Sequence, residues 1–158
     1  MGIISRLLSE GNVVLGLPAI DRKGALEEIA LLVGRRHHID HTPIFRALWR
    51  REQSGSTALG HGFAIPHARI PGIREPIVLF VRTQPPIEFG APDHRPVSAL
   101  FVILVPEDAN EEHLQILATV SEMLSSSRFR SRLEAAKDPA AIQRLFGEWA
   151  SDSGPSVK

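Results

Sequence analysis

The sequence predicts a single α/β domain in which a mixed central β-sheet of about five strands lies between α-helices on both sides. Helical spacing of apolar residues comes first, extended apolar segments fill the region 63–105, and helical spacing then returns. The 158 residues suit one domain, which we place at 1–150. The remaining residues, 151–158, are expected to form a flexible C-terminal tail.

Two helices are predicted in the first third of the chain. The first begins at Asp21, a suitable N-cap, and ends in the basic run 35–38, which matches the negative pole of a helix C-terminus. The second is predicted to have Thr42 as its cap and Pro43 at its first position, where proline is well tolerated. It should end near Gln53, before a glycine-rich segment.

The middle of the chain predicts strands and turns. SGSTALGHG, 54–62, is rich in glycine and hydroxyl side chains and indicates a loop, and FAIPH, 63–67, indicates a short strand. Branched and aromatic residues predict a strand over 77–82, and an extended edge with a turn follows over 85–97. The nearly unbroken apolar run 97–105 is typical of a strand that is buried on both faces.

The last third predicts two more helices. Helical spacing over 106–126 favours a helix capped by Asp108 or Asn110. A final helix is expected to begin at Asp138 and Pro139.

The composition excludes several classes of function. Lysine and arginine number 18, as do aspartate and glutamate, so the chain lacks the basic surplus of proteins whose main partner is nucleic acid. It contains no cysteine, which excludes disulfides and cysteine nucleophiles. Charges interrupt the apolar N-terminal segment, and no run approaches the roughly 18 apolar residues of a membrane span. We therefore expect a cytoplasmic protein without membrane insertion.

His67 is the first candidate for chemistry. It follows a proline at the end of a predicted strand, where one ring nitrogen can face a partner while the backbone holds the other. An imidazole with an ordinary pKa near 6.5 is largely neutral and nucleophilic near pH 7, so it can accept a phosphoryl group. On position alone, a purely structural histidine is favoured over a reactive one.

Two further side chains suit the same chemistry. His113 falls in the first turn of the helix predicted after residue 106, where its ring could donate a hydrogen bond to a phosphoryl oxygen or simply lie at the surface. Arg51, at the end of the second helix, offers a planar guanidinium fork for two phosphoryl oxygens. The glycine-rich loop after it lacks the Gly-Lys-Ser/Thr ending of a Walker A motif and differs from a GxGxxG fingerprint.

Histidines also allow a competing hypothesis, a metal site. HHIDH, 37–41, and the set His61, His67 and His113 have superficial metal-ligand spacing. A metal-dependent hydrolase built on them would lack well-placed carboxylate ligands, and the sequence contains neither HExxH nor a Gly-x-Ser-x-Gly elbow.

The segment REQSGSTALGHGFAIPHA, 51–68, resembles the active-site signature of the IIA components of the bacterial phosphoenolpyruvate-dependent phosphotransferase system, of the fructose/mannitol and nitrogen-related type. LFVILVPEDANEEHLQILATVSEML, 100–124, is similar to the second characteristic stretch of that family, and the resemblance extends over roughly residues 5–150. His61 and Phe63 depart from the usual residues. The first pattern is satisfied by Glu52, Gly60, Ala64, Ile65, Pro66, His67 and Ala68.

The resemblance implies a role for each candidate. His67 would accept a phosphoryl group from the phosphohistidine of HPr or its nitrogen-related counterpart, His113 would hydrogen-bond that group, and Arg51 would help neutralise it. No metal or other cofactor is implied. The surroundings of His67 are expected to lack carboxylates, because a negative charge would oppose the incoming phosphate. Residues expected around the pocket are Glu52, Ser56, Thr57, Gly60, His61, Gly62 and Pro66.

The N-terminal segment LLSEGNVVLGLPAIDRKGALEEIA, 7–30, resembles the nitrogen-related regulators most. Such proteins signal their phosphorylation state by binding targets such as potassium-transport proteins and sensor kinases. We therefore expect a phosphotransferase whose output is mainly regulatory. A IIA relay of fructose/mannitol-type sugar uptake is the alternative within the family, and a binding module without phosphorylation is the alternative from another class.

Overall fold

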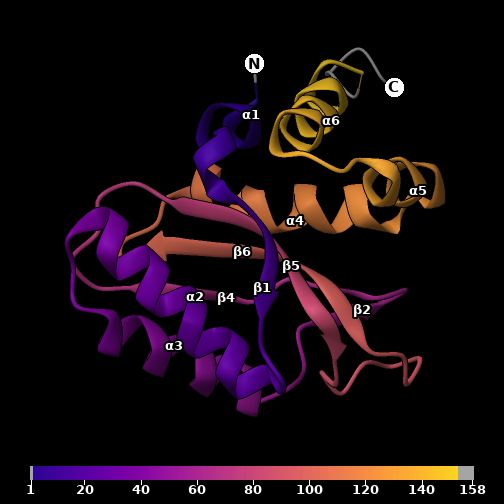
Figure 1. Ribbon diagram of the computed structural model, residues 1–158. Helices are drawn as coiled ribbons and strands as arrows, with labels where there is room; N and C mark the ends of the chain where they lie inside the picture. Colours follow the sequence, from indigo (N-terminus) through magenta and orange to yellow (C-terminus); the bar gives the residue numbers. More distant parts are fainter. Residues whose placement is uncertain (1, 153–158) are drawn as a thin grey trace.

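A six-stranded mixed β-sheet forms the centre of the computed structural model, which describes residues 2–152 (Figure 1). The sheet has the order β1-β5-β6-β3-β2, and β4 also pairs with β6. β5 and β6 are antiparallel, while β1 runs parallel to β5, and both β3 and β4 run parallel to β6. The predicted mixed sheet is confirmed, with six strands rather than about five. Their bounds are β1 Val13–Pro18, β2 Ala58–Gly60, β3 Phe63–Ala64, β4 His67–Ile70, β5 Ile77–Ile87 and β6 Val97–Pro106.

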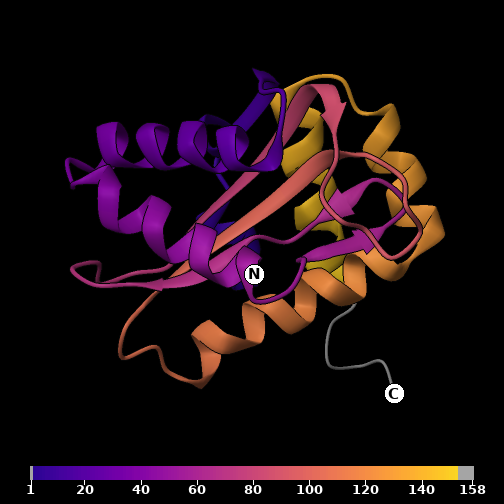
Figure 2. The same cartoon turned by 90° about the horizontal axis from the view of Figure 1, so that it is seen from below.

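Helices cover both faces of this sheet (Figures 1 and 2). α2 and α3 pack on one face, whereas α1, α4, α5 and α6 pack on the other. Among the described residues, no helix combines the length and the apolar character that crossing a bilayer requires. The helices are α1 Ile3–Leu7, α2 Arg22–His37, α3 His41–Gln53, α4 Glu111–Ser125, α5 Ser127–Ala135 and α6 Pro139–Asp152, and a 3-10 turn spans Glu10–Asn12.

The central strand β6 explains the unbroken apolar run in the sequence. Side chains alternate across a strand, so Phe101 and Ile103 enter the core beneath α4–α6, while Leu100 and Val102 enter the core beneath α2 and α3. Each face of the sheet therefore has its own core, as predicted for this segment. The ring of Phe146 from α6 lies 5.1 Å from that of Phe101, measured between centroids.

Capping side chains set where the helices begin. Asp21 accepts a hydrogen bond from the Gly24 amide at 2.7 Å, which confirms the predicted start of α2. The prediction of Thr42 as the next cap is wrong: Asp40 is the N-cap of α3, and its carboxylate accepts from the Thr42 amide at 3.0 Å. Pro43 is tolerated two positions further into the helix because amides of the first turn have no intrahelical acceptor.

Several elements were absent from the sequence-based prediction. β1, α1 and α5 lie in segments for which no element was predicted, and β2 lies within the predicted loop. The prediction of one strand over 63–67 is wrong: β3 ends at Ala64, and His67 begins β4 rather than ending a strand. β5 continues past the predicted end at residue 82. These strands are stabilised by pairing with distant segments, which local spacing does not reveal. α6 includes residues 151–152 of the expected tail, and residues 153–158 lie outside the described part of the chain.

Candidate active site

A pocket of about 650 Å³ brings His67, Arg51 and His113 together. His67 is the first residue of β4 and pairs with Ile103 of the parallel strand β6. The chain leaves β6 and turns back into α4, which places His113 in the wall of this pocket. The end of α3 supplies further lining residues, among them Arg51. The remaining lining residues are Ala47, Arg50, Ser54, Ala68, Arg69, Ile103, Val105, Leu114 and Leu117.

Both nitrogens of the His67 ring have a hydrogen-bond partner. Nδ1 lies 2.8 Å from the Ile65 carbonyl oxygen, and Nε2 lies 3.3 Å from Nε of Arg51. A carbonyl only accepts and a guanidinium only donates, so Nδ1 carries the proton and Nε2 keeps its lone pair. The geometry therefore selects one neutral tautomer, with Nε2 as the nucleophilic atom.

Burial and nearby charges hold the His67 ring in its neutral form. Half-burial of the ring is the largest influence, and it lowers the pKa of His67 below 6.5. The hydrogen bond to the Ile65 carbonyl opposes this change, the positive charge of Arg51 adds to it, and the negative charge of Glu52 opposes it. The net result is a lowered pKa, so the ring is unprotonated at neutral pH.

Arg51 is fixed by its own loop. Its Nη1 donates to the Gly55 carbonyl at 2.7 Å, so the guanidinium is held at both Nη1 and Nε. It belongs to the last turn of α3, next to the pocket. Because Arg51 is already held beside Nε2 of His67, its guanidinium can bind a negatively charged group that approaches this nitrogen.

His113 is the third residue of α4, one turn after its N-cap. Its main-chain amide donates to Oδ1 of Asn110 at 2.9 Å, so Asn110 rather than Asp108 is the cap. Within residues 2–152, Nδ1 of its ring is buried and has no hydrogen-bond partner. The structure therefore places this ring in the pocket wall without a hydrogen bond to His67.

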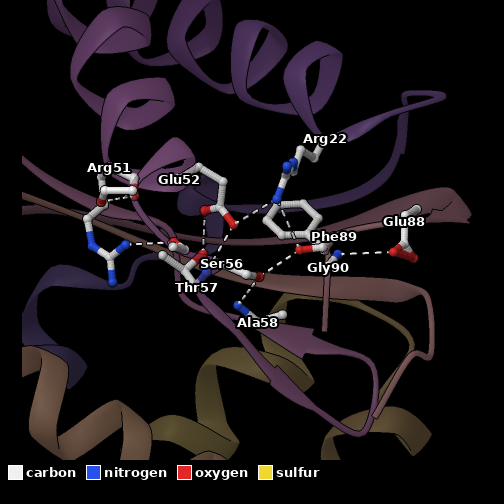
Figure 3. Close-up of polar contacts among 11 residues, drawn as sticks. Arg22, Arg51, Glu52, Ser56, Thr57, Ala58, Glu88, Phe89 and Gly90 are labelled. Carbon is white, nitrogen blue, oxygen red and sulfur yellow. Dashed lines mark hydrogen bonds and ion pairs between the residues drawn. The ribbon is translucent and has the colours of Figure 1, made fainter. Parts of the chain in front are cut away.

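A carboxylate does lie near His67, contrary to expectation. The segment 60–71 contains none, yet Glu52 at the end of α3 raises the pKa of His67 through its charge. Only 2% of Glu52 is exposed, and its carboxylate accepts from the Thr57 amide at 2.9 Å and the Thr57 hydroxyl at 2.6 Å (Figure 3). These bonds, with Arg22 at 3.8 Å, compensate the negative charge behind the pocket wall.

The other residues expected around the pocket lie elsewhere. Gly60, His61 and Gly62 form the turn between β2 and β3, all with positive φ, and His61 lines a separate cavity of about 290 Å³. The Pro66 carbonyl accepts from an amide of β6, and the Ser56 hydroxyl donates to a main-chain carbonyl. None of these five, nor Glu52 or Thr57, lines the pocket that contains His67.

Pocket residues that the sequence reasoning missed carry a readable signal. Arg69 lies two positions after His67 on β4, and side chains two apart on a strand share a face. Leu117 lies one helical turn after His113, and Leu114 next to it is 47% exposed. Strand periodicity from His67 would have identified Arg69, and helix periodicity from His113 would have identified Leu117, whereas Leu114 is not on the helix face that this spacing selects.

The structure also bears on the metal hypothesis. His37 ends α2, His38 is its C-cap with φ 57°, and His41 begins α3. Across residues 2–152, no three side chains of the histidine, cysteine, aspartate and glutamate types are grouped so that they could hold a metal ion.

Comparisons with known proteins identify the family. The family model described as "Phosphoenolpyruvate-dependent sugar phosphotransferase system, EIIA 2" matches residues 6–149. A nitrogen regulatory protein of Pseudomonas aeruginosa is 39% identical over 143 residues, which cover 90% of this chain and 93% of that protein. A fructose-specific EIIA component of Haloferax volcanii is 35% identical over 134 residues, or 83% of this chain and 86% of that one.

A solved structure agrees with these sequence matches. The crystal structure of nitrogen regulatory protein IIA-Ntr from Neisseria meningitidis superposes with a TM-score of 0.85 at 35% identity, covering 91% of this chain and 99% of that chain. Sequence and fold thus lead to the same assignment, and the expected resemblance is confirmed. The chain belongs to the EIIA 2 family of the phosphoenolpyruvate-dependent sugar phosphotransferase system.

Proposed function

We propose that the protein accepts a phosphoryl group on Nε2 of His67 from the phosphohistidine of a small HPr-type carrier, and that its phosphorylation state controls which proteins it binds. One observation carries this proposal. The Ile65 carbonyl holds the proton on Nδ1, which leaves the lone pair of Nε2 beside a fixed guanidinium. Family membership supports phosphoryl transfer as the general activity.

The transfer step balances with the groups present. Nε2 of His67 forms a bond to phosphorus while the bond from phosphorus to the carrier's ring nitrogen breaks, and that nitrogen leaves with the electron pair. The ring of His67 gains positive charge, which the Ile65 carbonyl stabilises through the Nδ1 proton. Arg51 turns its Nε–H from the ring nitrogen to a phosphoryl oxygen, while Nη1 remains on Gly55. His113 donates a further hydrogen bond from the opposite wall.

The surface around the pocket suits a phosphorylated protein carrier. Arg50 and Arg69 line the pocket together with Arg51, so three guanidinium groups favour an incoming phosphoryl group. Leu114, which is 47% exposed, and Leu117 provide apolar surface beside them. Apolar area and complementary charge together match a protein partner better than a small free anion.

Phosphorylation would also change what the pocket presents to other proteins. A phosphoryl group adds about two negative charges to a chain whose formal net charge is zero. The three pocket arginines would then face an internal dianion instead of an open site. This reversal is a sufficient switch for partner choice, and we propose regulatory targets such as potassium-transport proteins or sensor kinases.

Relatives support the regulatory interpretation and also one alternative. The names of the Pseudomonas and Neisseria proteins favour nitrogen-related regulation. A sugar-uptake relay is the second candidate function, favoured by the 35% identity to the fructose-specific component of Haloferax. The two functions use the same chemistry at His67 and differ in the carrier and in the acceptor downstream.

Intact-protein mass spectrometry at neutral pH tests the proposal. The protein is incubated with phosphoenolpyruvate, enzyme I and either HPr or its nitrogen-related counterpart. We expect one added phosphoryl group on the wild type and on His61→Ala, a matched histidine outside the pocket, and none on His67→Ala. Preference for the nitrogen-related carrier supports the regulator, and preference for HPr supports the uptake relay. Labelling of His67→Ala would contradict the assignment, and no labelling with either carrier would favour a pure binding module.

A further inference from the structure

A buried polar network lies behind the pocket, between the end of α3 and the start of β2 (Figure 3). At its centre, the Glu52 carboxylate accepts two hydrogen bonds from Thr57 and has Arg22 at 3.8 Å. Arg22 also donates to the Phe89 carbonyl at 3.3 Å. A buried carboxylate needs such partners, because an unpaired one would be strongly destabilising.

This network is connected to the His67 ring by main-chain hydrogen bonds. The Thr57 carbonyl accepts from the Ile65 amide at 3.0 Å, and the Ile65 carbonyl accepts from Nδ1 of His67 at 2.8 Å. Glu52 holds the amide and the hydroxyl of Thr57, so it anchors the residue at the beginning of this series. The residue whose carbonyl binds Nδ1 is thus connected through Thr57 to the Glu52 carboxylate, which does not line the pocket.

The hydrogen bond on the Nε2 side of the His67 ring involves the same short segment, residues 51–57. Arg51, which contacts Nε2, precedes Glu52 in the last turn of α3 and is tied to the Gly55 carbonyl. The two partners of His67 are thus both anchored by residues 51–57. A shift of this segment would change both contacts at once.

We propose that Glu52 is a positioning residue for His67: its carboxylate holds Thr57, and through Ile65 it keeps the proton on Nδ1 and the lone pair on Nε2. The effect of Glu52 on the rate of phosphoryl acceptance rests on the proposed function, whereas its effect on the His67 tautomer does not. The negative charge of Glu52 also supports this role, because it raises the pKa of His67 and so offsets part of the lowering caused by Arg51. The ring nitrogen is then more basic than burial beside arginine alone would make it.

Substitution of Glu52 is the direct test. Glu52→Met keeps a similar length without an acceptor oxygen, Glu52→Gln keeps one, and Glu88→Met makes the same change at an exposed glutamate. Nitrogen NMR of the His67 ring in the unphosphorylated protein reports the tautomer. We expect the Nδ1–H form in wild type and Glu88→Met, and a mixture with the Nε2–H form in Glu52→Met.

Kinetics give the second measurement. The rate of phosphoryl acceptance at saturating carrier should fall by at least about tenfold in Glu52→Met, because displacement of a reacting group by about 1 Å can cost about a hundredfold. KM for the carrier should stay within about twofold, since the buried network lies behind the pocket wall. The rate of Glu52→Gln should lie between those of the wild type and Glu52→Met.

Thr57 provides an independent pair of variants if Glu52→Met does not fold. Thr57→Val removes the hydroxyl donor with little change of shape, and Thr57→Ser restores it. We expect the tautomer mixture and the slower rate in the first and wild-type behaviour in the second. The proposal is overturned if Glu52→Met folds and matches Glu88→Met in tautomer and rate. If Glu52→Met does not fold, the same result for Thr57→Val overturns it. Failure of the wild type itself to accept phosphate would refute the proposed function, while the tautomer would still decide the positioning role.

Discussion

Replacement of Arg51 by alanine should slow phosphoryl acceptance without abolishing it. The guanidinium donates to Nε2 of His67 at 3.3 Å and is held by Gly55 at 2.7 Å, so it lies where phosphoryl oxygens would arrive in the proposed transfer. A hydrogen bond to a charged group contributes about 1.5–3 kcal/mol. At about 1.36 kcal/mol per factor of ten, the rate should fall by about 10- to 160-fold.

Solvent screening makes the contribution of the Arg51 charge smaller than its unscreened Coulomb attraction. Two unit charges about 4 Å apart attract by about 4 kcal/mol at an effective dielectric constant of 20. Arg51 is only partly buried, and water in the open pocket screens its charge further. Loss of the guanidinium should therefore cost about what a hydrogen bond to a charged group contributes, about 1.5–3 kcal/mol.

The assay is quenched-flow phosphorylation under single-turnover conditions, with neutral-pH mass spectrometry as the readout. Arg46→Ala, which removes an exposed arginine five residues earlier on α3, is the matched control and should retain the wild-type rate within about twofold. Arg51→Lys should lie between alanine and wild type, because an ammonium keeps the charge but loses the fork that spans Gly55 and His67. NMR titration should also show a higher pKa for His67 in Arg51→Ala, since Arg51 lowers it. A loss of less than threefold in Arg51→Ala would refute the reasoning.

Three other perturbations test the site and the fold. His113→Ala should slow labelling while leaving His67 able to accept phosphate, and mass spectrometry that finds no labelling at all would contradict the supporting role of His113. The lowered pKa of His67 means that the unfolded chain binds more protons just below pH 6.5, so the free energy of unfolding should fall as pH drops from about 7 to 5. Urea titrations of His67→Gln should show a weaker pH dependence than wild type, and an unchanged one would argue against the shift. Gly34→Ala would place a Cβ 2.9 Å from the Ile39 carbonyl oxygen, so urea unfolding should show a loss of about 1–3 kcal/mol. Gly11→Ala is its control, because a Cβ there would lie at an ordinary contact distance of 3.9 Å from the Ser9 hydroxyl oxygen, and equal effects of the two changes would refute the steric argument.

Local sequence patterns were sufficient for features that a short segment decides by itself. Asp21 caps α2 as predicted because its partner, the Gly24 amide, lies three residues away. The unbroken apolar run of β6 is buried on both faces as predicted, because helices on both sides are the usual environment of such a strand. Where two local signals competed, as at Asp40 and Thr42, the sequence prediction chose the wrong cap.

Local sequence patterns did not predict which strands pair with one another in the sheet. β1 pairs with β5, and β4 with β6, through registers between segments that are far apart in the chain. A strand of a few residues gains its stability from such pairing rather than from its own propensity. For this reason the prediction missed β1 and ended the strand at His67, although the residues themselves are ordinary strand formers.

The sequence by itself determined the family and was sufficient to propose His67 as the phosphoacceptor, because the signature around His67 is continuous in the chain. Only the tertiary structure decided which surroundings that residue has. Parallel pairing of β4 with β6 brings His113 to the pocket, the turn after α3 directs Arg51 to Nε2, and a glutamate on the same helix becomes a buried anchor rather than a pocket residue. The physical reason is that hydrogen-bond geometry and burial are properties of segments in contact, and contact between distant segments is set by the packing of the whole sheet.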